Sequence, residues 1–261
     1  MKTALITGAS GGIGYELARV FARHKHNLVL VARSADKLEQ LAQQLQQEFG
    51  IKVLVIPADL SLPRAAAAVF EQLQRANIQI DFLVNNAGFG NYGLFMETDW
   101  PKEEQMINLN IAALTHFTKV FGQEMVKNRS GRILNVASTA AFQPGPLMAV
   151  YYATKAYVLS FSEAIANELQ GTGVTVTALC PGPTESGFVD AAALHNSKLF
   201  KGKKIATSRE VAEYGYQALI RGRIVAVQGT TNKVMAKFVK FIPRKWQTAI
   251  VRKISERVNE A

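Results

Sequence analysis

The sequence predicts an α/β fold with one doubly wound sheet of about seven parallel strands, flanked by helices on both faces. Short runs of β-branched and other apolar residues alternate with longer segments whose apolar residues are spaced three and four apart, as expected for βαβ units. The short runs are continuously apolar, which is typical of strands that helices cover on both faces. The length of 261 residues suits one sizeable domain of this class.

The expected elements follow one another without an internal repeat, a low-complexity segment or a clear linker. Helical spacing is seen, for example, at Leu38, Leu41 and Leu45. We expect residues 1–230 to form the domain and residues 188–207, an alanine-rich and then basic stretch, to form a flap. The expected strands are Thr3–Thr7, Asn27–Ala32, Lys52–Pro57, Asp81–Val84, Arg132–Ala137, Val174–Leu179 and Arg223–Val227.

Composition indicates a cytoplasmic protein. The single cysteine, Cys180, excludes an intramolecular disulfide, and its place between an apolar run and Pro181 favours a buried packing residue over a nucleophile. The first apolar stretch is too short for a signal peptide, and no stretch reaches the ~20 apolar residues of a membrane span. The histidines and carboxylates show no metal-ligand spacing, so no metal is expected.

The net charge of +10 is unevenly distributed along the chain. Residues 1–220 hold 20 Lys and Arg against 18 Asp and Glu, whereas residues 221–261 hold 10 against 2. The body of the chain is therefore close to neutral, which argues against a nucleic-acid-binding domain. The basic character belongs to the C-terminal tail.

A glycine-rich loop follows the first expected strand. A strand, a glycine loop and a helix in succession place a phosphate at a helix N-terminus, where free N–H groups and the helix dipole favour negative charge. Gly8 would allow the tight turn, Gly12 the close approach of the backbone, and Gly14 the packing of helix on strand. The G-x-x-x-G-x-G spacing departs from the commoner G-x-G-x-x-G of the Rossmann-type fold, and glycines also make ordinary turns. The loop residues expected at the nucleotide are Gly8, Ser10, Gly12, Ile13 and Gly14.

The end of the second expected strand bears on the identity of the nucleotide. Folds that bind NAD place an acidic residue there for the ribose 2′-hydroxyl, whereas NADP-binding folds place a basic residue nearby. This strand is followed by Arg33 and Ser34, which could clamp a 2′-phosphate, and no carboxylate stands at its end. Arg33 could instead be a solvated residue before a helix whose N-terminus favours Asp36. Given the glycine loop, we expect NADP(H) to be preferred over NAD(H).

A serine, a tyrosine and a lysine form the candidate catalytic group. Ser138 follows the strand Arg132–Ala137, at the edge where open α/β sheets bind ligands. Tyr151 and Lys155 are four residues apart in a helical pattern and therefore share one helix face. The ammonium would lower the pKa of the phenol, which is about 10 when unperturbed, and so tune a proton donor toward neutral pH. Tyr152 is three residues from Lys155 and is expected to pack or to line the site.

Together with further motifs, these residues resemble the short-chain dehydrogenase/reductase family. The motifs fall in the family's order and cover roughly residues 3–187, whereas the C-terminal part resembles the family less. The stretch 188–207 stands where the family has its substrate loop and matches no substrate motif. The matching residues are Thr7-Gly8 with Gly12-Ile13-Gly14, Asp59-Leu60, Asn85-Asn86-Ala87-Gly88, Asn110 within Ile107-Asn108-Leu109-Asn110, Ser138, Tyr151 with Lys155, and Pro181-Gly182.

The resemblance implies a reaction and a role for each catalytic residue. Tyr151 would protonate the substrate oxygen while a hydride arrives from the nicotinamide. Lys155 would lower the tyrosine pKa and hold the nicotinamide ribose, and Ser138 would orient the carbonyl. Asn110 would hold a water that links Lys155 to solvent as a proton relay; a helix-kink or capping role is the alternative.

The resemblance also implies contacts along the rest of the cofactor. An aspartate would bond the adenine amino group, and the leucine after it would lie along the adenine ring. A turn after the fourth strand would shape the cofactor groove, although it could also be an ordinary turn with positive φ. The residues in these roles are Asp59 and Leu60 at the adenine, Asn86, Ala87 and Gly88 at the groove, and Pro181, Gly182, Thr184 and Ser186 at the carboxamide, with Ser186 where the family often has threonine.

Residues 231–261 are expected to form a basic, amphipathic helical extension. Apolar residues recur near every fourth position, with Lys and Arg on much of the other face, and the proline predicts two short helices joined at Ile242-Pro243. Such a tail can pack on its own domain or a neighbouring subunit, or attach to an anionic membrane surface. Nucleic acid is disfavoured, because no base-stacking pattern accompanies the charge. The apolar positions are Val234, Phe238, Phe241, Ile242, Trp246, Ile250, Ile254 and Val258.

The sequence therefore predicts an NADP(H)-dependent oxidoreductase that acts on a small-molecule carbonyl or secondary alcohol, as a homodimer or homotetramer. An apolar substrate is expected from the apolar character of the flap. Two other interpretations stay open: a catalytically inactive NADP(H)-binding sensor, and a membrane-associated scaffold that uses the tail. The presence of Ser138, Tyr151 and Lys155 weighs against the sensor.

Overall fold

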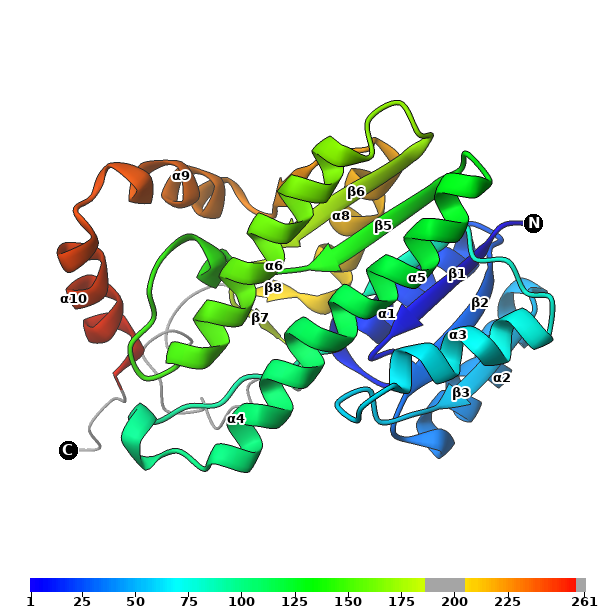
Figure 1. Cartoon of the computed structure of the whole chain (residues 1–261), viewed down its shortest axis with the longest axis horizontal. Helices are drawn as coiled ribbons and strands as arrows, with labels where there is room; N and C mark the ends of the chain where they lie inside the picture. Colours follow the sequence, from blue (N-terminus) through cyan, green and yellow to red (C-terminus); the bar gives the residue numbers. More distant parts are fainter. Residues whose placement is uncertain (186–204, 257–261) are drawn as a thin grey trace.

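The fold was established as a computed structural model, which describes residues 1–185 and 205–256 (Figure 1). Seven parallel strands form one sheet in the order β3-β2-β1-β4-β5-β6-β9, which confirms the predicted fold class. The first two strands have the expected ends, and the other five differ from the expected ranges by one or two residues at one or both ends. The strands are β1 (Thr3–Thr7), β2 (Asn27–Ala32), β3 (Val53–Pro57), β4 (Phe82–Asn85), β5 (Gly131–Val136), β6 (Val174–Cys180) and β9 (Val225–Val227).

Helices cover both faces of this sheet. One face carries α1, α2 and α8, and the other carries α3, α5 and α6. Helix α8 begins at a capping box, in which the Thr207 hydroxyl accepts from the Glu210 N–H and the Glu210 carboxylate accepts from the Thr207 N–H. The helices are α1 (Gly12–Arg23), α2 (Ala35–Phe49), α3 (Ala65–Arg75), η1 (Phe95–Glu97), α4 (Trp100–Ile107), η2 (Asn108–Ala113), α5 (Leu114–Lys127), η3 (Thr139–Phe142), α6 (Ala149–Glu168), α8 (Ser208–Ile220), α9 (Thr230–Phe238), η4 (Val239–Phe241) and α10 (Arg244–Ser255).

The alternation of side chains along each strand explains the two helical layers. In β1, Ala4 and Ile6 belong to the core under α1 and α8, whereas Leu5 belongs to the core under α3 and α5. All three side chains are fully buried. Because burial of a large aliphatic side chain stabilises a protein by ~1.5–3 kcal/mol, a continuously apolar strand is stable only between two helical layers.

The strand order reverses direction at β1 and β4. The chain passes from β1 outward to β3 and then crosses back to β4 on the other side of β1. The loops after β1 and β4 therefore diverge at the carboxyl edge of the sheet. Such a switch point opens a crevice in which doubly wound sheets bind their ligands.

The C-terminal segment folds back onto the domain. It forms two helices, α9 and α10, with a break at Ile242-Pro243, which confirms the predicted pair of helices. Val251 is buried against Met106, Tyr151 and Tyr152, so the inner side of the tail packs on its own domain. Contact of the outer side with a neighbouring subunit or a membrane stays a prediction. No helix within the described residues has the length and apolarity needed to cross a membrane.

Three expectations fall wholly or mostly on residues outside the described ranges. The flap predicted at 188–207 lies there except for its last residues, as do Ser186 and Val258. On either side of the gap, β7 (Thr184–Glu185) and β8 (Ala206–Thr207) pair in parallel.

Candidate active site

A large cavity runs along the carboxyl edge of the sheet, from the end of β3 to the C-terminal helices. Its volume of about 1290 Å³ exceeds the ~300–1,000 Å³ typical of a site for one small ligand, so it has room for a dinucleotide and a substrate together. The predicted site residues that line it are Gly8, Ser10, Gly12, Ile13, Arg33, Ser34, Asp59, Leu60, Asn86, Ala87, Gly88, Ser138, Tyr151, Lys155, Pro181, Gly182 and Thr184.

The glycine loop is built as the sequence predicts. Gly8 has a φ of 67° and Gly12 a φ of 55°, conformations that side-chain-bearing residues rarely adopt. Gly14 does not line the cavity; it lies beneath the loop, where a Cβ atom would collide with the carbonyl oxygen of Gly8. Its role is therefore the packing of helix on strand. The N-cap of α1, Gly11, has no side chain to bond the first N–H groups, and no acidic residue stands in the first turn, so the helix N-terminus can accept an anion.

Thr7 stabilises this loop through its hydroxyl. This residue is not among the predicted site residues. The Thr7 hydroxyl donates to the carbonyl of Val84 and accepts from the N–H groups of Asn86 (2.9 Å) and Ala87 (3.0 Å). The Asn86 side chain in turn donates to the Thr7 carbonyl at 2.9 Å and to the Gly8 carbonyl at 3.3 Å. The ends of β1 and β4 are thus joined by side-chain hydrogen bonds at the crevice. The signal available in the sequence is a hydroxyl on the last residue of the strand, directly after three apolar residues.

We expect Thr7→Val to destabilise the protein and to weaken cofactor binding. The substitution keeps the side-chain volume but leaves the Ala87 N–H without its partner and the Asn86 N–H with only the Val84 carbonyl at 3.1 Å, at a cost of ~1–3 kcal/mol in the free energy of unfolding. Thr177→Val is the matched control, because Thr177 is also fully buried on a strand and its hydroxyl has no hydrogen-bond partner within the described part of the chain. Denaturant unfolding and NADPH titration compare the two variants. Equal stability of both variants would contradict this assignment.

Arg33, Ser34 and Asp59 gather at one end of the cavity. Arg33 and Ser34 are exposed after β2, and the Ser34 hydroxyl makes no capping bond to α2, so both can reach an anion. Asp59 follows β3, and its Oδ1 accepts from the N–H and the hydroxyl of Ser61 at 2.9 and 2.6 Å. These hydrogen bonds, with the nearby positive charge of Arg33, lower the pKa of Asp59. The carboxylate is therefore ionised at neutral pH and offers an acceptor to an amino group.

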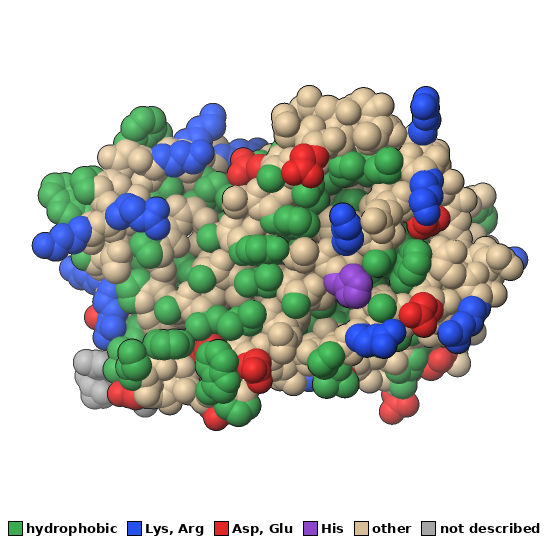
Figure 2. Space-filling view, viewed as in Figure 1, with side chains coloured by type: hydrophobic (Ala, Val, Ile, Leu, Met, Phe, Trp, Pro, Cys, Tyr) green, Lys and Arg blue, Asp and Glu red, His purple; other side chains and the backbone are tan. Residues whose placement is uncertain are grey.

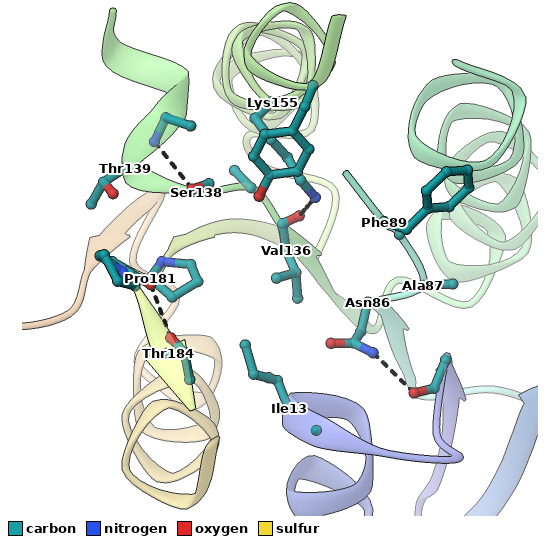
Figure 3. Close-up of a pocket in the computed structure, with 18 of the residues that line it drawn as sticks. Ile13, Asn86, Ala87, Phe89, Val136, Ser138, Thr139, Lys155, Pro181 and Thr184 are labelled. Atoms are coloured by element: carbon teal, nitrogen blue, oxygen red, sulfur yellow. Dashed lines mark hydrogen bonds between the residues drawn. The ribbon is translucent and has the colours of Figure 1, made fainter. Parts of the chain in front are cut away.

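Ser138, Tyr151 and Lys155 meet at the end of β5. Lys155 comes from α6, and its Nζ donates to the carbonyl of Val136 at 2.8 Å and lies 5.8 Å from the centre of the Tyr151 ring. The Ser138 hydroxyl accepts from the Ala140 N–H at 3.1 Å and is hydrogen-bonded to the Tyr151 side chain. In Figure 3, Ser138 and Lys155 face Ile13 across the cavity. The structure therefore brings the predicted serine, tyrosine and lysine together.

The pKa of Tyr151 differs from the sequence expectation. Burial raises it far above its usual value of 10, while the hydrogen bond from Ser138 acts in the opposite direction. Burial also lowers the pKa of Lys155 from 10.5 to about 8. The expected lowering of the tyrosine pKa is thus wrong for the protein alone, because the loss of water around the phenol outweighs its neighbours.

Asn110 has a structural partner for each side-chain group. Its Nδ2 donates to the Phe89 carbonyl at 2.9 Å and to the Thr154 hydroxyl at 3.1 Å, and its Oδ1 accepts from the Phe89 N–H at 3.2 Å. Asn110 lies in the π-helical turn η2, does not line the cavity, and ties the segment after β4 to α6. Its predicted role in a proton relay stays a prediction. The Asn110 Oδ1 atom, which also faces Gly88, has a second lone pair that could accept a hydrogen bond from the relay water.

The carboxamide end of the site follows β6. The Pro181 carbonyl accepts from the Thr139 N–H at 2.8 Å, and the Thr184 hydroxyl donates to the Gly182 carbonyl at 2.9 Å. Cys180, just before them, is fully buried, and burial raises the pKa of its thiol to about 12. The prediction of a packing cysteine is confirmed.

The C-terminal helices supply part of the cavity wall, which sequence reasoning missed. Met235 of α9 and Val251 and Ile254 of α10 line the cavity. The end of α10 lies against two tyrosines: the Tyr92 hydroxyl donates to the Ser255 carbonyl at 2.9 Å, and the Tyr152 side chain lies beside the Ser255 side chain. An amphipathic pattern tells which face of such a helix is apolar, but not which part of the protein that face covers.

Residues 2–196 match the family model described as short chain dehydrogenase. The ketoacyl reductase HetN from Nostoc sp. is 35% identical over 242 residues, which cover 92% of this chain and 83% of that protein. A solved short-chain dehydrogenase from Sphingobium yanoikuyae in complex with NADPH is 32% identical, with a TM-score of 0.82 and coverage of 94% of this chain and 97% of that one. The bulky-bulky ketone specific alcohol dehydrogenase from Comamonas testosteroni is 30% identical, with a TM-score of 0.79 and coverage of 92% of each chain. These proteins resemble the chain along most of its length, in sequence and in fold.

Proposed function

The chain belongs to the short-chain dehydrogenase/reductase family, and we propose that it is an NADP(H)-dependent oxidoreductase that interconverts an apolar ketone and its secondary alcohol. One observation carries this proposal. The hydroxyls of Ser138 and Tyr151 and the ammonium of Lys155 converge in a cavity whose far end presents Arg33. A proton donor and a phosphate-binding arginine thus share one continuous site.

The residues of the cavity fit a dinucleotide with a 2′-phosphate. The N-terminus of α1, with its glycine loop, would hold the pyrophosphate, and Arg33 with Ser34 the 2′-phosphate. Asp59 would accept from the adenine amino group. When bound, the nicotinamide supplies or takes up the hydride at the carbonyl carbon.

The protein's own residues handle the proton and the substrate oxygen. Ser138 would donate a hydrogen bond to the carbonyl oxygen and orient it, and Tyr151 would transfer its hydroxyl proton to the same oxygen as the hydride arrives at carbon. Because burial raises the pKa of Tyr151, the tyrosine is protonated at neutral pH, which is the state that ketone reduction requires. Lys155 would restrain the ribose and return a proton to the phenolate from solvent.

The substrate end of the cavity favours an apolar molecule. Met148, Met235, Val251 and Ile254 line this end, next to Tyr151. Burial of apolar surface there contributes roughly 25 cal/mol per Å² to the binding free energy, so a hydrocarbon-rich ketone should bind more tightly than a polar one. The specificity of the Comamonas testosteroni enzyme for bulky-bulky ketones agrees with such a pocket. The test is a turnover screen of apolar and polar ketones, with NADPH and NADH compared; turnover of polar ketones only would contradict the assignment of substrate class.

We expect Arg33→Asp to reverse the cofactor preference. A charge-assisted hydrogen bond of ~1.5–3 kcal/mol would be lost, and a carboxylate would repel the 2′-phosphate, so NADPH affinity should fall by roughly 10- to 100-fold or more. NADH affinity should hold or rise, because the new carboxylate can accept from a ribose hydroxyl. Titration of both cofactors measures the effect. Lys37→Asp is the control, since it makes the same charge change on α2 at a residue that does not line the cavity. Equal affinity of the parent protein for NADPH and NADH would end this part of the proposal.

A further inference from the structure

The C-terminal helices leave large apolar side chains exposed. Phe241 is 84% exposed, Trp246 66% and Phe238 64%. Val234, Met235, Ile250 and Ile254 are exposed beside them. We call the outward side of α9, η4 and α10 the tail face. Figure 2 shows hydrophobic and basic side chains gathered over these helices, at the left of the view.

The helices of the tail face carry charge of one sign, and the first acidic residue after them, Glu256, forms an ion pair with Arg252 at 3.8 Å. No Asp or Glu occurs between residues 214 and 255, and seven Lys and Arg fall within residues 230–255. Among them, Lys237, Lys240 and Lys245 are exposed around the aromatic side chains. The body of the chain is nearly neutral, so the molecule's positive charge is concentrated on this face. Aromatic and aliphatic side chains surrounded by Lys and Arg are typical of helices that lie in the surface of a membrane.

The tail face is continuous with the substrate end of the cavity. Met235 and Ile254 are exposed to solvent and also line the cavity, while Val251, one turn before the end of α10, packs beside Tyr151. The same two helices therefore have an inner side that forms the wall of the site and an outer side that meets the surroundings. An apolar molecule that arrives at this face therefore meets Met235 and Ile254, which also line the cavity.

We propose that the tail face docks on an anionic lipid bilayer, with the mouth of the substrate cavity turned toward the membrane. A second copy of the chain is a poorer occupant, because a symmetric contact through this face would bring like charges together and the rest of the body offers no excess of negative charge. Phosphate-bearing lipid headgroups neutralise the lysines, and the acyl region accepts the aromatic side chains. Entry of the substrate from the bilayer rests on the proposed function; the docking itself does not.

Sedimentation of the full-length chain with vesicles tests the docking. We expect binding to phosphatidylcholine vesicles that contain phosphatidylglycerol, and little binding to phosphatidylcholine alone. Since each basic residue near an anionic surface strengthens binding about fivefold, the variant with Lys237→Glu, Lys240→Glu and Lys245→Glu should bind at least ~100-fold more weakly. The variant with Phe238→Ser, Phe241→Ser and Trp246→Ser should also lose binding. All six side chains are exposed, so folding and NADPH affinity should persist.

Matched controls carry the same changes elsewhere on the surface. Lys52→Glu, Arg75→Glu and Lys119→Glu together reverse three exposed charges, and Leu62→Ser removes an exposed apolar side chain. These variants should bind vesicles like the parent chain. The docking is overturned if the parent binds neither vesicle type, if the controls lose binding equally, or if the tail-face variants change only the oligomeric state. If the chain binds anionic vesicles but reduces no ketone, the proposed function is refuted and the docking is still supported.

Discussion

Tyr151→Phe is expected to lower kcat by about 100- to 10,000-fold, the usual contribution of a positioned general acid. Phenylalanine keeps the ring that packs against Val251 and Met106 and removes only the hydroxyl. The glycine loop, Arg33 and Lys155 are untouched, so the Kd of NADPH should change little. Initial rates of ketone reduction and an NADPH titration, made on the same preparation, separate the two effects.

Tyr152→Phe provides the matched control for this result. Tyr152 also lines the cavity, but its side chain lies beside Ser255 of α10, away from the Ser138–Tyr151 pair. Loss of its hydroxyl should cost ~0.5–1.5 kcal/mol of stability and loosen the cavity wall, which raises KM more than it lowers kcat. A Tyr152→Phe enzyme without turnover beside an active Tyr151→Phe enzyme would show that the wrong tyrosine has been assigned.

Lys155→Met should be the second most damaging change. Methionine has similar length but neither the charge nor the hydrogen bond to the Val136 carbonyl. A neighbouring cation changes the ionisation of an acid by about 10- to 1,000-fold, and we expect a loss of that order in kcat, with weaker NADPH binding because the ribose contact is also lost. Steady-state kinetics and cofactor titration measure both. Full retention of kcat would contradict the role given to the ammonium.

The same variant has a stability signature that depends on pH. Burial lowers the pKa of Lys155 from 10.5 in the unfolded chain to about 8 in the folded one, so the charged lysine destabilises the fold below pH 8. Between pH 8 and 10.5 the unfolded chain binds more protons, and this destabilisation disappears. The free energy of unfolding of the parent chain should therefore rise relative to that of Lys155→Met from about pH 7 to about pH 10. If the difference in unfolding free energy between the two chains stays constant from pH 7 to pH 10, the charged form of Lys155 does not destabilise the fold.

The parts of the site that could be predicted are those in which local sequence fixes local geometry. A glycine cluster between a strand and a helix sets the anion-binding turn, and a spacing of four residues puts Tyr151 and Lys155 on one face of α6. The position of Ser138 followed from the rule that parallel strands present their carboxyl ends at one edge. In each case the relevant neighbours are close in sequence or are ordered by the sheet.

The missed features depend on contacts between distant segments. Asn85 donates to Thr118 and Asn135, and Asn135 donates to Ser162, so four elements share one buried polar network that no sequence window contains. Val251 of α10, which forms part of the cavity wall, likewise packs with Tyr151 and Tyr152, about a hundred positions earlier in the sequence. The raised pKa of Tyr151 arises from burial, and the residues next to Tyr151 in the sequence do not indicate how deeply it is buried.

The most direct test of the account is the transfer of deuterium from nicotinamide-labelled NADPH to an apolar ketone, followed by mass spectrometry of the alcohol. We expect one deuterium at the carbinol carbon with the parent chain and with Tyr152→Phe, and a rate lower by at least about 100-fold with Tyr151→Phe. A parent chain that binds NADPH yet transfers no deuterium to any ketone of the panel would contradict it, and would favour a cofactor-binding sensor instead.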